Sequence, residues 1–380
     1  MPKTVFYASV GAALKRYDID VEEAALTERD TVMLPANVQY AWPHPSRRSL
    51  YVISSNGGPG IAGDRHFANA LAIDPATGAL RLLGNAAALP SRPIHASVDA
   101  GGAFLLTAYN NPSAVTVHRL NADGAVGAPV AQPDDLDMGI YAHQVRAAPG
   151  NRVVLLVTRG NHAEAGKPED PGAIKAYRFD NGMLRNLASI APGNGLGFGP
   201  RHLDFHPSEP WALVSIERQN KLYVFKFDDT TGLARDPLFI KDTLREPASP
   251  SPQGAGPSHV HPSGKFVYLT NRTFPASGAG SRKVAEGGEN TVVGFALDAK
   301  TGEPKRLQNI EGHGIQLRTF GIDPSGRMLA VASIMPLNDG TLPAGIMVYR
   351  IAADGILSFV RKYDVDVGKA QQFWSGMVTL

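Results

Sequence analysis

The sequence predicts an all-β fold in which seven similar four-stranded sheets form a ring. Three observations support this prediction. A unit of two strands around a turn recurs six times, the 40 Gly and 29 Pro residues lie between short apolar runs all along the chain, and the two chain ends carry complementary parts of one further unit. Repeats of roughly 40–50 residues with four short strands each are typical of β-propellers. We therefore expect a seven-bladed β-propeller that takes up residues 1–380 as one domain.

Each repeat centres on a turn between two apolar strands, and Pro or Asp anchors that turn. A second pair of strands follows most anchors, joined by a turn rich in Asp, Thr and Gly, as in LAIDPATGALRLL and FKFDDTTGL. Short turns connect antiparallel neighbours, so each repeat reads as one antiparallel sheet of four strands. The anchors are Pro45, Asp99, Pro149, Pro207, Pro262 and Pro324, which are spaced 50 to 62 residues apart.

The two chain ends are expected to build the seventh sheet together. The N-terminal segments VFYASVG, LKRYDID and DTVMLP resemble strands two to four of a repeat that lacks its first strand, and the C-terminal segment QQFWSGMVTL can supply it. A sheet shared in this way would leave the ring without an open edge. The polar segment TFPASGAGSRKVAEGGEN, residues 273–290, is expected to be an excursion over one face.

Composition excludes several classes of function. The 37 basic and 35 acidic residues are interspersed, so no basic face for nucleic acid is predicted. No apolar run approaches the roughly 20 residues that span a bilayer. The chain has no Cys, which excludes disulfides, thiolate nucleophiles and Cys-ligated metals. The N-terminus lacks a secretory apolar segment, so we expect a cytoplasmic protein that uses no cofactor and binds neither membrane nor nucleic acid. The sequence indicates no particular oligomeric state.

Two positions of each repeat are expected at one mouth of the central channel. The sixth residue before the anchor and the tenth after it lie at the same end of an antiparallel hairpin. These twelve positions hold four Arg, one His and one Glu, and five of the six come from the consecutive repeats anchored at Pro149, Pro207 and Pro262. The first set is Gln39, Pro93, His143, Arg201, Gly256 and Arg318, and the second set is Ser55, Tyr109, Arg159, Glu217, Arg272 and Ile334.

Simpler interpretations stand beside this one. Arg201 and Glu217 can form a cross-strand ion pair without chemistry, worth roughly 0–1 kcal/mol if it is exposed. The polar stretch after Arg159 fits a solvated rim position, and His143 alone would fit a structural role. Strand alternation places His202 on the opposite face from Arg201, as a supporting residue. Structural roles in turns are expected for His44, His206 and His261, and no recognisable spacing is found for His95, His162 and His313.

The stretch GPRHLDFHP with Glu217, the His143 that precedes the turn at Pro149, and the stretch VYLTNR ending in Arg272 resemble the lactonase family of seven-bladed propellers over essentially the whole chain. That family includes bacterial propeller-type 6-phosphogluconolactonases and fungal carboxy-cis,cis-muconate lactonising enzymes. The segment YAHQVRAAP departs from the His-Ser pair of many relatives, and the insertion after Arg272 is unusual. The resemblance implies an active site of His143, Arg201, Glu217 and Arg272, to which the mouth positions add Gln39, Arg159 and Arg318 as substrate-binding residues.

Lactone hydrolysis needs a base for water, a positive group at the developing oxyanion and an acid for the departing alkoxide. His143 and Glu217 can share the proton transfers, and Arg201 and Arg272 can polarise the carbonyl or hold a carboxylate or phosphate, without a metal. We expect metal-independent hydrolysis of a sugar-acid lactone similar to 6-phosphogluconolactone, with a small anionic lactone or carboxylate as substrate.

Other functions remain open at this stage. The same residues can close a lactone onto an unsaturated dicarboxylate, so a muconate-type cyclase is the first alternative. A non-catalytic binding scaffold is the second, although a scaffold more often presents aromatic and apolar anchors. A metal-dependent hydrolase ranks last, because the twelve mouth positions contain a single carboxylate.

Overall fold

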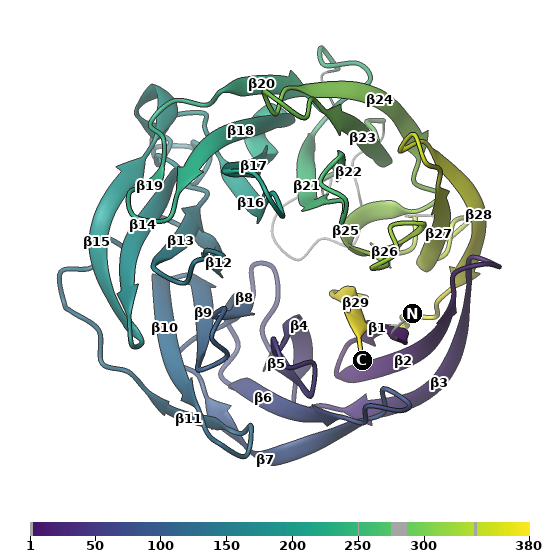
Figure 1. Cartoon of the computed structure of the whole chain (residues 1–380), viewed down its shortest axis with the longest axis horizontal. Coiled ribbons are helices and arrows are strands. Elements are labelled where there is room, and N and C mark those ends of the chain that lie inside the picture. Colours follow the sequence, from purple (N-terminus) through teal and green to yellow (C-terminus); the bar gives the residue numbers. More distant parts are fainter. Residues whose placement is uncertain (1–2, 250, 275–286, 338–339) are drawn as a thin grey trace.

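Seven sheets stand around a central channel in the computed structural model, which describes residues 3–249, 251–274, 287–337 and 340–380 (Figure 1). We call each sheet a blade. In blades 1 to 6 the strands follow one another from the channel outwards in sequence order (Figure 1). The predicted seven-bladed β-propeller with four antiparallel strands per blade is confirmed.

The first three blades follow the repeats anchored at Pro45, Asp99 and Pro149. Blade 1 consists of β4 (Asn37–Pro43), β5 (Ser49–Ser55), β6 (His66–Ile73) and β7 (Leu80–Ala88). Blade 2 consists of β8 (Pro93–Val98), β9 (Phe104–Asn110), β10 (Ser113–Leu120) and β11 (Val126–Pro129). Blade 3 consists of β12 (Ala142–Ala147), β13 (Val153–Thr158), β14 (Ala173–Asp180) and β15 (Met183–Ile190).

The next three blades follow the other anchors, and the outer strand of blade 4 is split in two. Blade 4 consists of β16 (Pro200–Phe205), β17 (Trp211–Ile216), β18 (Lys221–Asp228), β19 (Gly232–Leu233) and β20 (Phe239–Asp242). Blade 5 consists of β21 (Gln253–Val260), β22 (Phe266–Thr273), β23 (Thr291–Leu297) and β24 (Pro304–Glu311). Blade 6 consists of β25 (Ile315–Ile322), β26 (Met328–Met335), β27 (Gly345–Ile351) and β28 (Leu357–Asp364). Most of the predicted excursion at 273–290, residues 275–286, lies outside the described residues.

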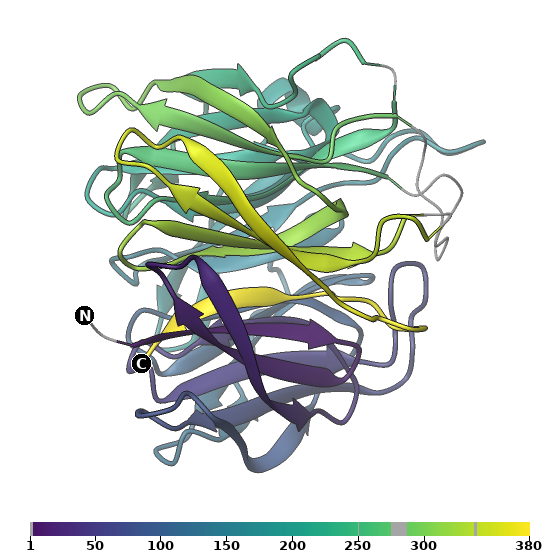
Figure 2. The same cartoon turned by 90° about the vertical axis from the view of Figure 1, so that its right-hand side faces the viewer.

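Blade 7 combines both ends of the chain, as the sequence predicts. The C-terminal strand β29 (Ser375–Thr379) is innermost and pairs antiparallel with β1 (Thr4–Val10), which is followed by β2 (Ala13–Asp20) and β3 (Ala25–Met33). Figure 2 shows the two termini close together on the same side of the ring. The shared blade therefore closes the ring without leaving an open edge of β1.

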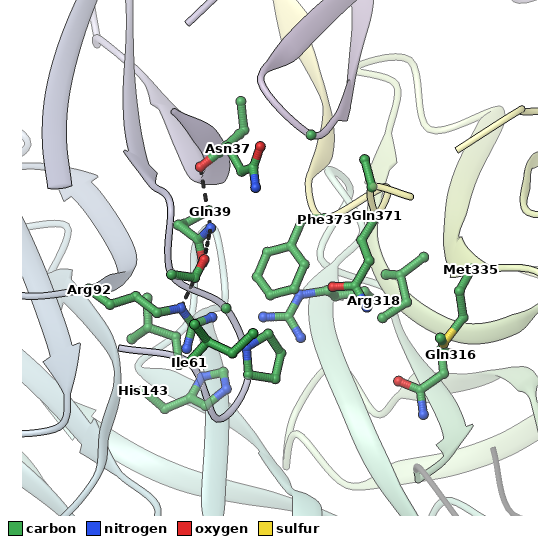
Figure 3. A pocket seen from close by; sticks show the side chains of 18 of the residues that line it. Asn37, Gln39, Ile61, Arg92, His143, Gln316, Arg318, Met335, Gln371 and Phe373 are labelled. Atoms are coloured by element: carbon green, nitrogen blue, oxygen red, sulfur yellow. Dashed lines mark hydrogen bonds between the residues drawn. The ribbon is translucent and has the colours of Figure 1, made fainter. Parts of the chain in front are cut away.

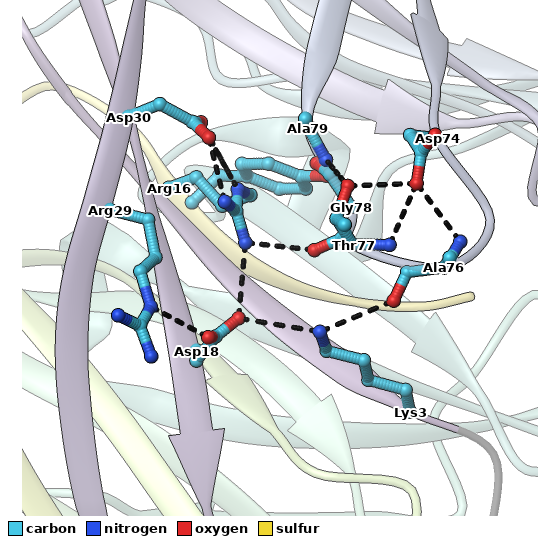
Figure 4. A network of polar contacts seen from close by, with 11 residues as sticks. Lys3, Arg16, Asp18, Arg29, Asp30, Asp74, Ala76, Thr77, Gly78 and Ala79 are labelled. Atoms are coloured by element: carbon cyan, nitrogen blue, oxygen red, sulfur yellow. Dashed lines mark hydrogen bonds and ion pairs between the residues drawn. The ribbon is translucent and has the colours of Figure 1, made fainter.

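Hydrogen bonds fasten blade 7 to both of its neighbours. Toward blade 6, the Ser375 amide donates to Oγ1 of Thr319 at 2.8 Å. Toward blade 1, Arg16 donates from Nη1 to the Thr77 carbonyl at 2.8 Å and pairs with Asp18 and Asp30 on its own blade (Figure 4). Closure thus involves specific polar contacts in addition to the β1–β29 ladder.

The turns that anchor the repeats also connect successive blades. In three of them a His ring donates from Nε2 to a Gly carbonyl of the next blade at 2.8–2.9 Å. Gly264 has a φ of +73°, and a Cβ there would lie 2.6 Å from the His206 ring, so both the backbone and the contact require glycine. The predicted structural roles of these histidines are confirmed, and the pairs are His44 with Gly102, His206 with Gly264 and His261 with Gly326.

The apolar core lies between facing blades. Leu155 and Val157 of blade 3 share one buried cluster with Val214 and Phe225 of blade 4, and all four side chains are fully buried. Each blade therefore depends on its neighbours for burial, and the channel is free to be lined by polar side chains.

Deleting residues 375–380 is expected to destabilise the whole ring. The deletion removes β29, exposes the edge of β1 and uncovers apolar side chains that pack on Val378. A loss of several kcal/mol corresponds to a fall in Tm of roughly 5 °C for a chain of this size. Thermal unfolding monitored by circular dichroism measures it, and a truncated protein that melts with the parent would contradict the closure.

Candidate active site

A β-bulge interrupts the innermost strand of each of blades 1 to 6 at the same point of the ladder. In blade 4, Pro200 pairs with Ile216 and His202 pairs with Ser215, which leaves Arg201 unpaired. Bulges redirect side chains and are frequent beside active sites. The residues left unpaired are Gln39, Ile94, His143, Arg201, the Gly256–Pro257 pair and Arg318. Four of the predicted site residues are therefore at equivalent bulges.

These bulges surround a cavity of about 620 Å³ at one mouth of the channel, which we call the mouth cavity (Figure 3). Six of the seven predicted site residues line it: Gln39, His143, Arg159, Glu217, Arg272 and Arg318. The seventh, Arg201, is only 1% exposed and does not reach the cavity surface. The hairpin-end argument thus located the cavity, whereas Arg201 lies buried beneath its surface.

The carboxylate of Glu217 is the centre of an ion group that joins three blades. Oε2 lies 2.8 Å from Nε of Arg201 in blade 4 and 3.1 Å from Nη2 of Arg272 in blade 5. Oε1 lies 3.4 Å from Nη1 of Arg159, which follows β13 in blade 3. Glu217 itself is 3% exposed. The solvated rim position considered for Arg159 is wrong, since this side chain is only 18% exposed and also stacks on Tyr141.

The charged residues of this ion group shift one another's pKa values. Burial alone would raise the pKa of Glu217, but Arg272, Arg159 and Arg201 together lower it to about 2. Burial, followed by repulsion from Arg272, lowers the pKa of Arg201 to about 9. Glu217 is therefore ionised at neutral pH and is a poor proton acceptor.

His143 is the imidazole that the bulge of β12 directs into the mouth cavity (Figure 3). Its Nδ1 has no hydrogen-bond partner among the residues that the structure describes. Burial, followed by repulsion from Arg201 and Arg318, holds the pKa of His143 well below its ordinary value near 6.5. The free protein thus holds a neutral imidazole beside several guanidinium groups.

The alternation of side chains expected for a regular strand does not hold at the bulge of β16. His202, expected on the opposite face from Arg201, lies inside the channel with its ring centroid 5.2 Å from that of His143 and 5.7 Å from that of His95. The unpaired Arg201 shifts the alternation by one residue, which is why the prediction for His202 is wrong. His95, which had no recognisable spacing, belongs to the same buried group of rings.

Several cavity residues escaped the sequence argument. Arg92 lies one residue before the predicted mouth position in its repeat, and Tyr141 and Gln316 lie two residues before theirs. Extending the mouth positions by two residues toward the N-terminus would have found all three. Phe373 and His162 lie in segments outside the repeated hairpins, so the repeat gave no signal for them.

Some equivalent positions do not reach the mouth cavity. The Tyr109 hydroxyl bonds to Thr116 within blade 2, and Ser55 bonds to His66 within blade 1. Pro93 pairs with Tyr109, and the bulge residue there is Ile94 instead. Seven of the twelve positions, including the apolar Ile334, line the cavity; the expectation is wrong for the other five, Ser55, Pro93, Tyr109, Arg201 and Gly256.

The described residues contain no group of three or more His, Cys, Asp or Glu side chains placed to hold a metal ion. Among the cavity-lining residues described, Glu217 is the sole acid, and its two oxygens already face arginines. The described residues also include no helix that is long and apolar enough to cross a membrane. The expected cytoplasmic location stays a prediction.

Comparison with known proteins identifies the family. A family model described as lactonase, 7-bladed beta-propeller, matches residues 5–335. The chain belongs to this lactonase family. A 6-phosphogluconolactonase of Bacillus subtilis strain 168 is 26% identical over 322 residues, which cover 83% of each chain. The 6-phosphogluconolactonase of Pectobacterium carotovorum subsp. carotovorum strain PC1 is 30% identical over 327 residues, 80% of this chain and 88% of the relative.

Solved structures agree on the fold of this lactonase-family enzyme. A structure described as the periplasmic gluconolactonase of Pseudomonas aeruginosa superposes with a TM-score of 0.75 at 20% identity over 99% of both chains. A protein from Lactobacillus plantarum gives a TM-score of 0.74 at 21% identity over the whole of both chains. At this level of identity the likeness concerns the propeller itself.

Replacing Glu217 by Gln is expected to destabilise this lactonase-family protein. The substitution leaves three arginines without their shared counter-charge, and breaking a buried ion pair on one side costs roughly 3–5 kcal/mol. The folded-state pKa of about 2 lies below the ordinary value of 4.5, so the contribution of Glu217 is complete above pH 4.5 and is lost as the pH falls through 2. The gap in unfolding free energy between parent and variant should therefore narrow in acid.

Urea unfolding at pH 7 and pH 3 measures this gap. Glu209→Gln is the matched control, because Glu209 is exposed in the turn at the other end of the same hairpin. A Glu217→Gln protein as stable as the control at pH 7 would contradict the assigned role of the ion group.

Proposed function

We propose that this protein hydrolyses the lactone of a sugar acid, of the 6-phosphogluconolactone type, by acid and base catalysis without a metal. The observation that supports this most is the pairing of an unpartnered, neutral imidazole with a strongly cationic cavity. The relatives named 6-phosphogluconolactonase and membership of the lactonase family point to the same substrate class. The residue roles below follow from the contacts of the mouth cavity.

Arg272 is the candidate for binding the lactone carbonyl. It lines the mouth cavity, and its Nη2 is fixed by Glu217 while its Nε has no partner among the described residues. A guanidinium aimed at an oxyanion stabilises the charge that develops as water attacks. Arg201, buried beneath the surface, is better suited to positioning Glu217 than to touching substrate.

His143 is the candidate base. It takes a proton from water as the water oxygen bonds to the lactone carbonyl carbon, and a tetrahedral oxyanion results. When that intermediate collapses, the bond to the ring oxygen breaks and the imidazolium returns the proton to the departing alkoxide. One water is consumed and one hydroxy acid is formed, with no net change in the protonation of His143.

The low pKa of His143 fits this role only with an anionic substrate. Burial is the main cause of the low pKa of His143 in the free protein, and repulsion from Arg201 and Arg318 adds to it. An anion bound among the arginines offsets their repulsion, and this raises the pKa of His143 toward the range in which an imidazole accepts a proton at neutral pH. The cationic cavity thus prepares the base when substrate arrives. Glu217, with a pKa of about 2, serves as a counter-charge in this scheme.

The function is tested with purified protein and fresh gluconolactone, 6-phosphogluconolactone and muconate lactone, each corrected for spontaneous hydrolysis. Turnover of a sugar-acid lactone that is unchanged by EDTA is expected. Activity that EDTA abolishes and a divalent cation restores would overturn the metal-independent mechanism, and preferential turnover or formation of muconate lactone would favour a cyclase. A protein inert toward all three would favour a binding scaffold.

His143→Asn should lower kcat by roughly 10²- to 10⁴-fold, the usual contribution of general acid and base catalysis. His313→Asn is the matched control, because His313 is exposed and stacks on Phe359 outside the mouth cavity. Circular dichroism and melting curves of both variants separate catalysis from folding. A His143→Asn enzyme with the kcat of its parent would remove His143 from the mechanism.

A further inference from the structure

A second group of cations shares the mouth cavity with the Glu217 ion group. Arg92 precedes β8 and is 7% exposed, and Nε of Arg92 donates to Oε1 of Gln39 at 3.0 Å. Nε2 of Gln39 in turn lies within hydrogen-bonding distance of the carbonyls of Asn37 and Gly57 (Figure 3). The orientation of Arg92 is thereby fixed, and its Nη1 and Nη2 have no partner among the described residues.

Arg318 completes this group from the bulge of β25. Its guanidinium carbon lies 3.7 Å from the ring centroid of Phe373, and that of Arg92 lies 5.8 Å from the same centroid. The guanidinium group of Arg318 makes no hydrogen bond or ion pair with any residue that the structure describes. Figure 3 shows Phe373 and Arg318 together on the cavity wall. One aromatic ring therefore orders two guanidinium groups without neutralising either.

The charge of this second group is uncompensated. Arg159, Arg201 and Arg272 already share the carboxylate of Glu217. Burial, followed by repulsion from Arg201, Arg272 and Arg92, holds the pKa of Arg318 well below its ordinary value. Like charges held together out of water are costly, and a bound anion relieves that cost.

We propose that Arg92 and Arg318, ordered by Gln39 and Phe373, form a subsite for a phosphomonoester dianion on the substrate. Two guanidinium groups with free N–H donors match two negative charges on three phosphate oxygens. A single carboxylate would balance half of this charge. The inference rests on the proposed function in so far as the phosphate belongs to a sugar-acid lactone. It assigns different roles to the arginines of the mouth cavity. Arg272 serves the reacting carbonyl, while Arg92 and Arg318 recognise the phosphate.

This division implies that phosphate recognition contributes to turnover. A phosphate held at two fixed guanidinium groups restricts the sugar acid to a few orientations, so that the lactone carbonyl lies near Arg272 and His143. Binding energy from a remote group of this kind is expressed in kcat/KM. The unphosphorylated lactone, which lacks that anchor, should be the poorer substrate.

Arg318→Gln and Arg92→Gln test the subsite from two different blades. We expect each to lower kcat/KM for 6-phosphogluconolactone about 10- to 100-fold more than for gluconolactone, as expected for losing a charge-assisted hydrogen bond. Arg81→Gln is the matched control, since Arg81 is exposed on β7 outside the mouth cavity, and it should leave the ratio of the two values unchanged. Equal losses on both lactones would overturn the subsite.

Calorimetric titration with inorganic phosphate separates this inference from the proposed function. The parent and Arg81→Gln should bind phosphate, and Arg318→Gln and Arg92→Gln should bind it at least tenfold more weakly at the same ionic strength. Phosphate binding that is lost in the variants of a protein inert toward lactones would leave the subsite standing and the proposed function refuted. Phosphate binding that is the same in all four folded proteins, or absent from the parent, would refute the subsite.

Discussion

The mouth of this propeller depends on one carboxylate. Glu217 faces Arg159, Arg201 and Arg272 at 2.8 to 3.4 Å, and these three arginines come from three consecutive blades. Without that shared negative charge, guanidinium groups buried beside one another would repel, and the blades that carry them would lose a common contact at the channel. With it, the group is ordered and still strongly positive. Glu217 therefore joins three blades and leaves the mouth cavity with a net positive charge.

The same residue explains the chemistry assigned to its neighbours. Because Glu217 is held ionised by three arginines, it is suited to orienting cations and poorly suited to taking up a proton. The neutral imidazole of His143, which a bulge directs into the mouth cavity, is the base that we propose, and in the proposed scheme a bound anion raises its pKa. In the proposed scheme, an anionic lactone supplies the negative charge that offsets these arginines. In this scheme anion binding changes the pKa of His143, which a surface that only attracts anions would not do.

The architecture could be predicted because the residues that form the turns can be recognised in the sequence of each repeat. The Pro- and Asp-anchored turns and the Gly after them fix where strands reverse, and the incomplete ends predicted the β1–β29 pairing. The cationic cluster could be predicted because the two ends of each inner hairpin lie at the same mouth of the channel, so charged residues at both ends are brought together. Bulges could not be read from the apolar pattern, so the placement of His202 failed. The burial of Arg201 beneath the cavity surface could not be predicted either, because it depends on side-chain packing between blades.

Residues outside the repeat were the harder part of the site. Phe373 belongs to the segment that leads into β29, and its role emerges only when the closed ring places it against Arg318 and Arg92. Closure of the ring thus places Phe373 against the two arginines, a contact that the local sequence does not indicate.

The most direct test of this account is a crystal structure of the protein with 6-phosphogluconate, the hydroxy acid that hydrolysis of the phosphorylated lactone would release. The account predicts the product in the mouth cavity, with its carboxylate within hydrogen-bonding distance of Arg272 and near His143, and with its phosphate on Arg92 and Arg318. A product bound elsewhere on the ring, or bound in the mouth cavity with its phosphate away from both of these arginines, would contradict it.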